Sequence, residues 1–456
     1  MRIVQVLPED INGGAFRVPV YLHREYEKLG FRSFLVVGEK HSNWDFVIEL
    51  PNRDFRSSWA KFLLKVENIF SSYLNFRGSW RIKEFIRFIG QPSRQLKIWL
   101  GYEDFDFPGT SFLIDFLKKE RIDILNLHVL HGFWLKDRGF FDLRLLPQIS
   151  KITPTVFTLH DMWLITGHCS HSFDCERWKT GCGSCPDITI PPAIRRDLSH
   201  KNWLIKKSIY QKSSFWCIAP SEWMARMAQK SILSYGLRGV EVIYNFVDLE
   251  TFRPLKSSEK LRLKKEFGIP HNSFVLVSAG KSLRTNRWKG FDVLVEALKT
   301  ISDEYIFVLA LGGTGYGEKQ YVEQIGNVKI IYIPFEKDHR KVAIYYAISD
   351  AFVLTSRAEN FPLSVIEASA CGAVPIASDV GGVREMIRDG ENGFVVDSGN
   401  YVKFAERIKI LIEKNKLLRS MRIKAIENSK RFSIENQLKK YINFFQRVVD
   451  DFYKYR

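Results

Sequence analysis

The chain has 456 residues, which corresponds to about three domains of ordinary size or two large ones. Hydrophobic residues make up 45% of the sequence and charged residues 26%, so disordered, collagen-like and disulfide-scaffold proteins are excluded. The 68 Lys and Arg residues exceed the 51 Asp and Glu residues, and the net charge of +17 favours an anionic partner such as a nucleic acid, an acidic membrane surface or a phosphorylated ligand.

The first residues are strand-like and then acidic, and they do not lead into an apolar core, so we expect no secretory signal. No apolar run approaches the roughly 18 residues of a membrane span. We therefore expect a cytoplasmic protein whose six cysteines are reduced.

Short β-branched segments alternate with longer helical patterns from one end of the chain to the other. Such alternation predicts an α/β fold with parallel sheets covered by helices, and several segments are apolar almost throughout, as buried strands are. Because ten strands would crowd a single sheet, we expect two Rossmann-like halves. The expected strands are residues 2–7, 33–37, 122–128, 155–161, 241–245, 274–280, 306–312, 328–335, 351–356 and 373–379.

This pattern places an N-terminal domain at residues 1–220 and a second domain at residues 221–432. Residues 433–456 carry apolar side chains at helical spacing with no strand after them, which predicts an amphipathic closing helix.

Residues 52–100 interrupt the alternation of strands and helices. They contain ten basic and three acidic residues, with aromatic and aliphatic side chains between them. Basic residues beside an apolar face are typical of helices that lie on an anionic membrane surface. They are equally typical of a helical insertion whose aromatic side chains pack on their own domain, and periodicity does not distinguish the two.

Residues 356–375 read SRAENFPLSVIEASACGAVP and carry Glu359 in the loop after an apolar strand and Glu367 inside the next helix. This helix begins at about Pro362 to Ser364, where unpaired N–H groups and the positive end of the helix dipole favour a phosphate. The two glutamates would then accept hydrogen bonds from the hydroxyl groups of two sugars, which is the layout of a nucleotide sugar. The alternative is a capping box formed by Ser364 and Glu367, with Glu359 an ordinary loop residue.

The stretch from Glu359 to Gly393, which continues with CGAVPIASDVGG and DGENG, resembles the C-terminal motif of retaining GT-B glycosyltransferases of family four. Asn360 and Phe246 depart from the family pattern, because the family usually has glycine at both positions, and this affects the assignment of the donor sugar. The other matching segments are Gly13-Gly14, His160-Asp161, Pro220-Ser221-Glu222, residues 242–248 and residues 289–292.

The resemblance implies that the second domain binds an NDP-sugar and that transfer retains the anomeric configuration. In the family, cations at the positions of Arg284 and Lys289 stabilise the departing diphosphate, and a histidine at the position of His160 contacts the transferred sugar or the acceptor. No catalytic metal is implied. The expected catalytic residues are His160, Arg284, Lys289 and Glu359, and the expected donor-binding residues are Gly14, Asn360, Phe361, Pro362, Leu363, Ser364 and Glu367.

Four cysteines lie within seventeen residues in the loop after His160: Cys169, Cys175, Cys182 and Cys185. Their density in a reducing compartment favours a structural zinc site, although only the last two have a usual ligand spacing. The alternative is a set of reduced, packed cysteines. The segment around them also resembles a branch of the same family found in bacterial surface polysaccharide assembly.

Together these features predict a GT-B protein whose two domains face each other across a cleft and whose last helix returns to the first domain. We expect a UDP- or GDP-sugar donor, a lipid-linked saccharide acceptor, an anionic membrane surface as partner and no nucleic acid. The protein would act at the inner face of the cytoplasmic membrane in bacterial exopolysaccharide, capsule or O-antigen assembly.

Two other classes of protein remain as alternatives. A nucleotide-dependent oxidoreductase or epimerase would also use two Rossmann-like halves, but the Gly-x-Gly-x-x-Gly expected after the first strand is missing. A non-catalytic nucleic-acid-binding protein would account for the positive charge.

Overall fold

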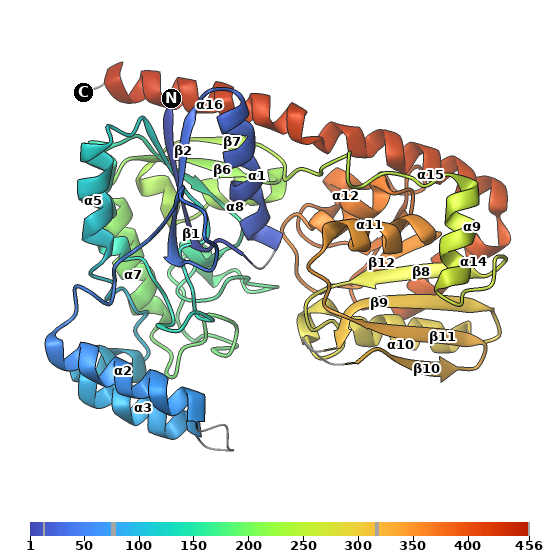
Figure 1. Cartoon of the computed structure of the whole chain (residues 1–456), viewed down its shortest axis with the longest axis horizontal. Coiled ribbons are helices and arrows are strands. Elements are labelled where there is room, and N and C mark those ends of the chain that lie inside the picture. The colour runs from blue at the N-terminus through green and yellow to red at the C-terminus, as the bar shows by residue number, and fades with distance from the viewer. Residues whose placement is uncertain (12–13, 74–78, 315–318, 455–456) are drawn as a thin grey trace. The chain divides into compact units, whose positions relative to one another are not determined.

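The computed structural model describes residues 1–456 apart from 12–13, 74–78, 315–318 and 455–456, and the side chains of residues 14–16, 70–73 and 79–80 are also outside the description. The chain divides into two compact units (Figure 1). Unit 1 comprises Met1–Ala219, Ala225–Val242 and Ile442–Arg456, and unit 2 comprises Pro220–Met224 and Ile243–Tyr441. The sequence placed all of residues 221–432 in the second domain, whereas residues 225–242 belong to unit 1.

Unit 1 is built on a sheet of seven parallel strands in the order β3-β2-β1-β4-β5-β6-β7. The central strands β4 and β5 are buried along their whole length, as expected for parallel strands covered on both faces. Residues 225–242 belong to this unit because β7 extends its sheet beyond β6. The strands are β1 (Arg2–Glu9), β2 (Arg32–Glu39), β3 (Val47–Glu49), β4 (Ile124–Leu127), β5 (Thr155–Thr158), β6 (Phe215–Ala219) and β7 (Leu237–Val242).

The helices that begin in this part of the chain surround the sheet and also form the insertion described below (Figure 1). They are α1 (Gly14–Lys28), α2 (Ser58–Tyr73), α3 (Ser79–Gly90), α4 (Pro92–Leu100), α5 (Thr110–Lys119), α6 (Leu146–Ile152), α7 (Ser199–Tyr210) and α8 (Glu222–Gln229). Four short 3₁₀ turns accompany them in the described residues: η1 (Leu143–Leu145), η2 (Trp163–Ile165), η3 (Arg177–Lys179) and η4 (Ile232–Tyr235).

Unit 2 is built on a second sheet in the order β10-β11-β9-β8-β12-β13-β14, parallel except for the antiparallel pair of β10 and β11. Alternate residues of β8 enter different apolar clusters: Val275 and Val277 pack with α11 and α12, and Leu276 packs with α10 and α14. Helices therefore cover both faces of this sheet. The strands are β8 (Phe274–Ala279), β9 (Ile306–Thr314), β10 (Tyr321–Ile325), β11 (Val328–Pro334), β12 (Ala351–Leu354), β13 (Val374–Ser378) and β14 (Phe394–Val396).

The helices of this part of the chain alternate with the strands, as the sequence pattern indicated. They are α9 (Ser257–Glu266), α10 (Phe291–Thr300), α11 (His339–Ile348), α12 (Leu363–Ala370), α13 (Val383–Met386), α14 (Tyr401–Glu413), α15 (Asn415–Ser429) and α16 (Ile434–Lys454), with the 3₁₀ turns η5 (Arg287–Lys289) and η6 (Lys430–Phe432). The predicted α/β architecture of two parallel-dominated sheets is thus confirmed.

The predicted closing helix is α16, and most of its apolar side chains are buried while most of its polar side chains are exposed; Gln437 is buried and Tyr453 is exposed. Its residues from Ile442 onward belong to unit 1, where the ring of Phe445 lies 6.3 Å from that of Tyr26. None of the helices in the described ranges combines the length and apolar character needed to cross a membrane.

Each sheet has one point at which the strand order reverses. In unit 1 it lies between β1 and β4, and in unit 2 it lies between β8 and β12. Open α/β sheets bind ligands in the crevice outside the carboxyl ends of the strands at such switch points. The loops that follow β1, β4, β8 and β12 are therefore the places to look for function.

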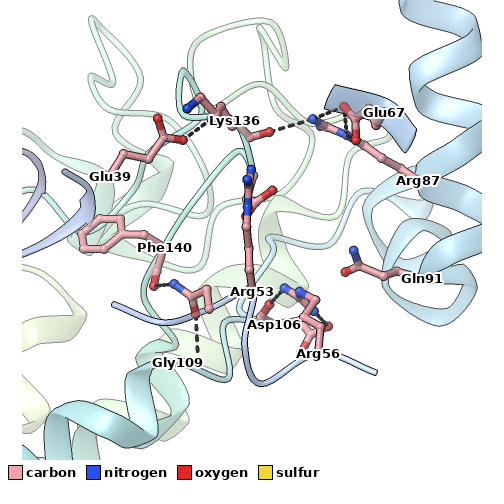
Figure 2. Close-up of polar contacts among 12 residues, drawn as sticks. Glu39, Arg53, Arg56, Glu67, Arg87, Gln91, Asp106, Gly109, Lys136 and Phe140 are labelled. Carbon is pink, nitrogen blue, oxygen red and sulfur yellow. Dashed lines mark hydrogen bonds and ion pairs between the residues drawn. The ribbon is translucent and has the colours of Figure 1, made fainter. Parts of the chain in front are cut away.

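Residues 52–100 form the helices α2, α3 and α4, and α2 and α3 lie side by side, apart from the sheet of unit 1 (Figure 1). Arginines at the base of this insertion pair with acidic residues of the same unit: Arg53 with Asp137 at 3.3 Å and Arg56 with Asp106 at 3.0 Å (Figure 2). Ala60, Leu64 and Ile86 are buried between the helices. One face of the insertion thus packs on protein, as one of the two interpretations expects.

The opposite face of the insertion remains exposed. Several of its large apolar side chains are between 46% and 64% exposed, and the exposed lysines Lys65 and Lys97 lie on the same helices. These apolar side chains include Trp59, Phe62, Ile69, Phe85, Phe88 and Trp99. Apolar side chains gathered in this way on a soluble surface indicate an interaction site.

Candidate active site

The switch point of unit 2 brings Lys289 and Glu359 together. Lys289 closes the η5 turn in the loop after β8, and Glu359 lies in the loop after β12. The ammonium Nζ of Lys289 is 2.7 Å from Oε1 of Glu359, and the same oxygen accepts a hydrogen bond of 2.8 Å from the hydroxyl of Ser356. Two predicted site residues, seventy positions apart in the sequence, therefore form one polar cluster.

Close contacts of the backbone hold these two loops in place. Gly290 has φ of 62°, and a Cβ at this position would lie 2.1 Å from the carbonyl oxygen of Thr355, so the loops approach as closely as they do only with glycine here. The guanidinium of Arg357 pairs with Asp292 at the start of α10, and its backbone N–H donates to the carbonyl oxygen of Trp288 at 2.8 Å.

The start of α12 has no side-chain cap. Its N-cap residue is Pro362, which makes no side-chain cap hydrogen bond. Ser364 therefore does not occupy the N-cap position that the capping-box interpretation requires. The N-cap residue Pro362 lies three residues after Glu359 in the chain, and the uncapped N–H groups of the helix and the positive end of its dipole are suited to a phosphate.

Glu367 lies one turn into α12 and is 4% exposed. Phe361 is also buried, and its ring stacks on Tyr244 with centroids 5.2 Å apart. The two positions that depart from the family pattern are both integrated into unit 2: the amide oxygen of Asn360 accepts from the hydroxyl of Ser221 at 2.9 Å, and Phe246 is 6% exposed.

Arg284 points elsewhere. Its guanidinium donates to the hydroxyl of Tyr321 on β10 at 2.8 Å and lies over the rings of Tyr321 and Tyr332. In the described part of the chain its partners are these two tyrosines, so the structure places Lys289 with Glu359 but does not place Arg284 with them.

The switch point of unit 1 holds a row of buried polar groups. The hydroxyl of Thr158 lies 2.8 Å from the amide oxygen of Asn126, and the amide nitrogen of Asn126 lies 3.1 Å from Nε2 of His128. Because an amide nitrogen only donates, Nε2 of His128 accepts and its proton resides on Nδ1. Nδ1 of His128 then donates to Nε2 of His160 at 2.9 Å. His160 is consequently neutral with its proton on Nδ1.

Burial explains why both rings are neutral. It lowers the pKa of His160 to about 4, although the charge of Asp161 acts in the opposite direction. It lowers the pKa of His128 well below its usual value, and the neighbouring His160 adds to this effect. A neutral pair of this kind is suited to hydrogen bonds with uncharged hydroxyl groups.

A third histidine, His131, contacts the residue that follows His160. Nε2 of His131 is 2.8 Å from Oδ2 of Asp161, and although burial alone raises the pKa of Asp161, His131 and further hydrogen bonds bring it below its usual value. Nδ1 of His131 is buried and has no hydrogen-bond partner in the described ranges. An orphan polar atom at a sheet's switch point indicates a place for a ligand or a water molecule.

The buried side chain of Lys206 holds the loop after β5 in place. Its side chain is fully buried, donates to the carbonyl oxygens of Trp163 at 2.7 Å and Thr166 at 3.1 Å, and pairs with Glu103 at 2.9 Å. Burial lowers the pKa of this lysine, and Glu103 opposes the shift. Lys206 thereby positions the segment that begins with Asp161.

The sequence analysis missed His128 and His131. His128 was the last residue of a predicted strand, and this carboxyl-terminal position was a usable signal, but its meeting with His160 depends on β4 and β5 being neighbours. Gly14 begins α1 after β1, at the same switch point. Its predicted neighbour Gly13 lies outside the described residues.

The four loop cysteines line one cavity together with His168, whose Nε2 is 3.3 Å from Sγ of Cys185 and whose Nδ1 is 3.1 Å from the carbonyl oxygen of Pro192. Burial raises the pKa of Cys169 to about 12 and that of Cys182 to about 11. Within the described ranges no group of three or more His, Cys, Asp or Glu residues is arranged to hold a metal ion. The structural zinc stays a prediction, and it requires the thiols to turn toward one another.

Two family descriptions match consecutive parts of the chain. Residues 12–251 match Glycosyltransferase Family 4, and residues 259–430 match Glycosyl transferases group 1. The colanic acid biosynthesis glycosyl transferase WcaC of Escherichia coli K12 is 27% identical over 71% of this chain and 76% of its own length. D-inositol 3-phosphate glycosyltransferase 1 of Catenulispora acidiphila is 28% identical over 50% of this chain, which spans 56% of that relative.

Solved structures share the fold. Sucrose-phosphate synthase from Thermosynechococcus elongatus aligns with a TM-score of 0.61 at 15% identity over 99% of both chains. HepE from Anabaena, solved in complex with UDP-glucose, aligns with a TM-score of 0.60 at 18% identity over 98% of this chain and all of its own. The alternatives of an oxidoreductase and of a nucleic-acid-binding protein find no support in these matches. The chain belongs to glycosyltransferase family 4, and the protein is a glycosyltransferase of GT-B fold.

Proposed function

We propose that this protein transfers a sugar from a UDP- or GDP-sugar to a lipid-linked saccharide in the assembly of a bacterial surface polysaccharide, with retention of the anomeric configuration. The observation that carries the proposal is the cluster of Lys289, Glu359 and the uncapped start of α12 at the switch point of unit 2. The name of WcaC supports polysaccharide assembly, and the UDP-glucose complex of HepE supports a nucleotide-sugar donor.

In this proposal the N–H groups at the start of α12 and the ammonium of Lys289 bind the diphosphate of the donor. The bond between the anomeric carbon and the phosphate oxygen breaks, and negative charge develops on that oxygen. A fixed cation and fixed N–H dipoles stabilise this charge more in the transition state than in the ground state. The acceptor oxygen forms its bond on the same face of the sugar, and its proton passes to the departing phosphate.

Glu359 and Glu367 have different tasks in the same site. Glu359 accepts hydrogen bonds from hydroxyl groups of the transferred sugar and keeps the ammonium of Lys289 in place at 2.7 Å. Glu367, deeper in α12, accepts from the ribose hydroxyl groups of the nucleotide. The neutral pair of His128 and His160 in unit 1 binds hydroxyl groups of the acceptor or of the transferred sugar.

The direct test is a thermal-shift screen of the full-length protein with UDP- and GDP-sugars, since a ligand that binds only the folded state raises the midpoint of unfolding. One nucleotide should raise the midpoint, and Glu367→Gln should reduce the rise. Release of UDP or GDP from the stabilising donor then establishes turnover. If neither nucleotide class shifts the midpoint and none is hydrolysed, the proposed function is wrong.

The exposed face of α2, α3 and α4 supports the lipid-linked acceptor. Its aromatic side chains would enter the interface of an anionic membrane, and Lys65 and Lys97 would attract the lipid headgroups. Replacing Trp59, Phe62 and Phe85 by serine should abolish sedimentation with anionic vesicles while leaving donor hydrolysis intact. Replacing the exposed Tyr305 and Ile423 of unit 2 by serine provides the matched control. Vesicle binding that survives the first set of changes would contradict the membrane surface.

A further inference from the structure

The insertion and the body of unit 1 enclose a cavity of about 170 Å³ that no step of the proposed donor chemistry uses. Its walls come from α2, α3 and the loop that follows β4, and it opens to solvent. Four cations face it against a single acid. The charged and aromatic lining residues are Glu67, Lys83, Arg87, Phe133, Lys136 and Arg138.

The arginines of this cavity are already paired. Arg87 forks onto both carboxylate oxygens of Glu67, at 2.8 and 2.9 Å, and also donates to the carbonyl oxygen of Lys136 at 2.7 Å (Figure 2). Arg138 pairs with Glu84 at 3.3 Å. The one acid of the lining is thus neutralised, and the arginines are held rigidly.

The two lysines are not paired. In the part of the chain that the structure describes, the ammonium groups of Lys83 and Lys136 have no hydrogen bond or ion pair, while the backbone N–H of Lys136 is fixed by Glu39 at 2.5 Å. Two ammonium groups without an ion-pair partner that line one small cavity repel each other, and a bound anion lowers that repulsion.

The cavity is connected to the histidines at the switch point of unit 1. Phe133 lines it, and the ring of Phe133 stacks on His131 with centroids 5.7 Å apart and an interplanar angle of 18°. The exposed apolar face of the insertion adjoins it on the same helices. An acceptor with a hydroxyl at the histidines, an anionic group beyond Phe133 and an apolar chain along the insertion would fit all three features.

We propose that Lys83 and Lys136 bind the diphosphate of a polyprenyl diphosphate-linked saccharide acceptor. This inference rests on the proposed function and names the acceptor's anionic group and where it binds. Each phosphate of such a diester diphosphate carries one negative charge, so two ammonium groups neutralise it. A cavity of this volume is too small for a whole lipid-linked sugar and suits a headgroup alone.

The test compares two double variants of the full-length protein that lose the same charge. The cavity variant, Lys83→Ala with Lys136→Ala, removes the two unpaired ammonium groups of the cavity. The control variant, Lys65→Ala with Lys97→Ala, removes two exposed lysines of the same insertion. The probes are phosphatidylcholine vesicles that carry either a polyprenyl diphosphate or phosphatidylserine at equal surface charge. Inorganic pyrophosphate is titrated in a Lys289→Ala background, in which the donor site contributes little.

We expect the cavity variant to lose affinity for pyrophosphate and for polyprenyl diphosphate vesicles by about tenfold or more, because it lacks two charge-assisted hydrogen bonds to phosphate oxygens. The control variant should lose little affinity for pyrophosphate or for polyprenyl diphosphate vesicles. It should instead bind phosphatidylserine vesicles more weakly than the cavity variant does, because Lys65 and Lys97 attract anionic headgroups. Equal losses in the two variants would overturn the proposal, and so would a loss confined to soluble pyrophosphate. Hydrolysis of the NDP-sugar should be unchanged in the cavity variant. If the unmodified protein does not hydrolyse any NDP-sugar, that result contradicts the proposed function and does not bear on the cavity.

Discussion

The two switch points of this protein differ in charge although the sheets that create them are alike. In unit 2 an ammonium, a carboxylate and the start of a helix meet at the carboxyl ends of β8 and β12. In unit 1 the ends of β4, which borders the switch point, and of its neighbour β5 are followed by neutral histidines whose pKa values burial holds low. One site is suited to a polyanion and the other to hydroxyl groups, so the side chains at the strand ends give two similar sheets different binding chemistry.

Removing the cation of unit 2 should have the largest effect. Lys289→Ala should lower turnover by about 10²-fold or more, because the ammonium opposes charge that develops on the leaving phosphate. Initial rates of nucleoside diphosphate release measure this, with circular dichroism to show that the variant is folded. Lys299→Ala, an exposed lysine of α10, is the control and should retain normal turnover. Normal turnover of the Lys289 variant would contradict the assignment of a diphosphate-binding site to unit 2.

Changing the histidine of unit 1 should separate the two sites. His160→Asn should reduce sugar transfer by about tenfold or more, because the ring orients a reacting hydroxyl group. The thermal shift with the nucleotide sugar should stay as in the unmodified protein. His271→Asn, at an exposed position of unit 2, should change neither measurement. If the His160 variant instead loses the thermal shift, then the histidine belongs to the donor site.

The low pKa values of unit 1 predict how stability depends on pH. Since the folded-state pKa of His160 is about 4, below the usual 6.5, the unfolded chain binds more protons between these values. The free energy of unfolding should therefore fall as pH decreases from about 6.5 toward 4. His23, His128 and His168, whose pKa values are also lowered by burial, act in the same direction.

Urea unfolding followed at a series of pH values checks this dependence. The slope between pH 6.5 and 4 should be smaller in His160→Asn, which cannot take up the proton. Asp161, whose pKa is lowered, contributes stability that is lost only below its usual value of 3.8 and so lies outside this window. An unchanged slope in the variant would show that His160 titrates normally in the folded protein.

The cysteine loop of unit 1 should have the smallest effect on turnover. We expect about one zinc ion per chain by elemental analysis, as in structural sites with four thiolate ligands. Cys182→Ser and Cys185→Ser should lower the zinc content and the midpoint of thermal unfolding, while Cys217→Ser should leave the zinc content unchanged. Zinc-free protein with a normal midpoint would identify the cysteines as packed thiols.

The fold was predictable where strands are apolar and long enough to show their period. Strand β8 and strand β9 were expected at nearly their observed bounds, because both faces of each are covered. Strand β6 was missed because a short run that is apolar on both faces is not distinguished from a buried helix by periodicity. Strands β3 and β14 have three residues each, and β10 is a five-residue edge strand with mostly exposed residues, so none has a long enough pattern to detect.

The sequence identified site residues within single loops but not the contacts between residues of different loops. Glu359 and Glu367 were identified within one motif, and Lys289 came from the family resemblance. The contact of Arg284 with Tyr321 could not be foreseen, because it depends on the pairing of β10 with β11. The pairing of His128 with His160 likewise depends on the neighbourhood of β4 and β5 in the sheet, which no local pattern specifies.

The helix α16 begins in unit 2 and ends in unit 1, and residues 220–224 belong to unit 2 although the segments on both sides belong to unit 1. Neither unit is therefore encoded by one uninterrupted stretch of sequence. A truncated gene product that stops after β7 would lack Phe445 and so leave Tyr26 without one of the rings that pack on it. If the two units were expressed separately, unit 1 would need the C-terminal peptide that begins at Ile442, supplied by co-expression or by circular permutation. Proteolytic cleavage within α16 should therefore destabilise both units.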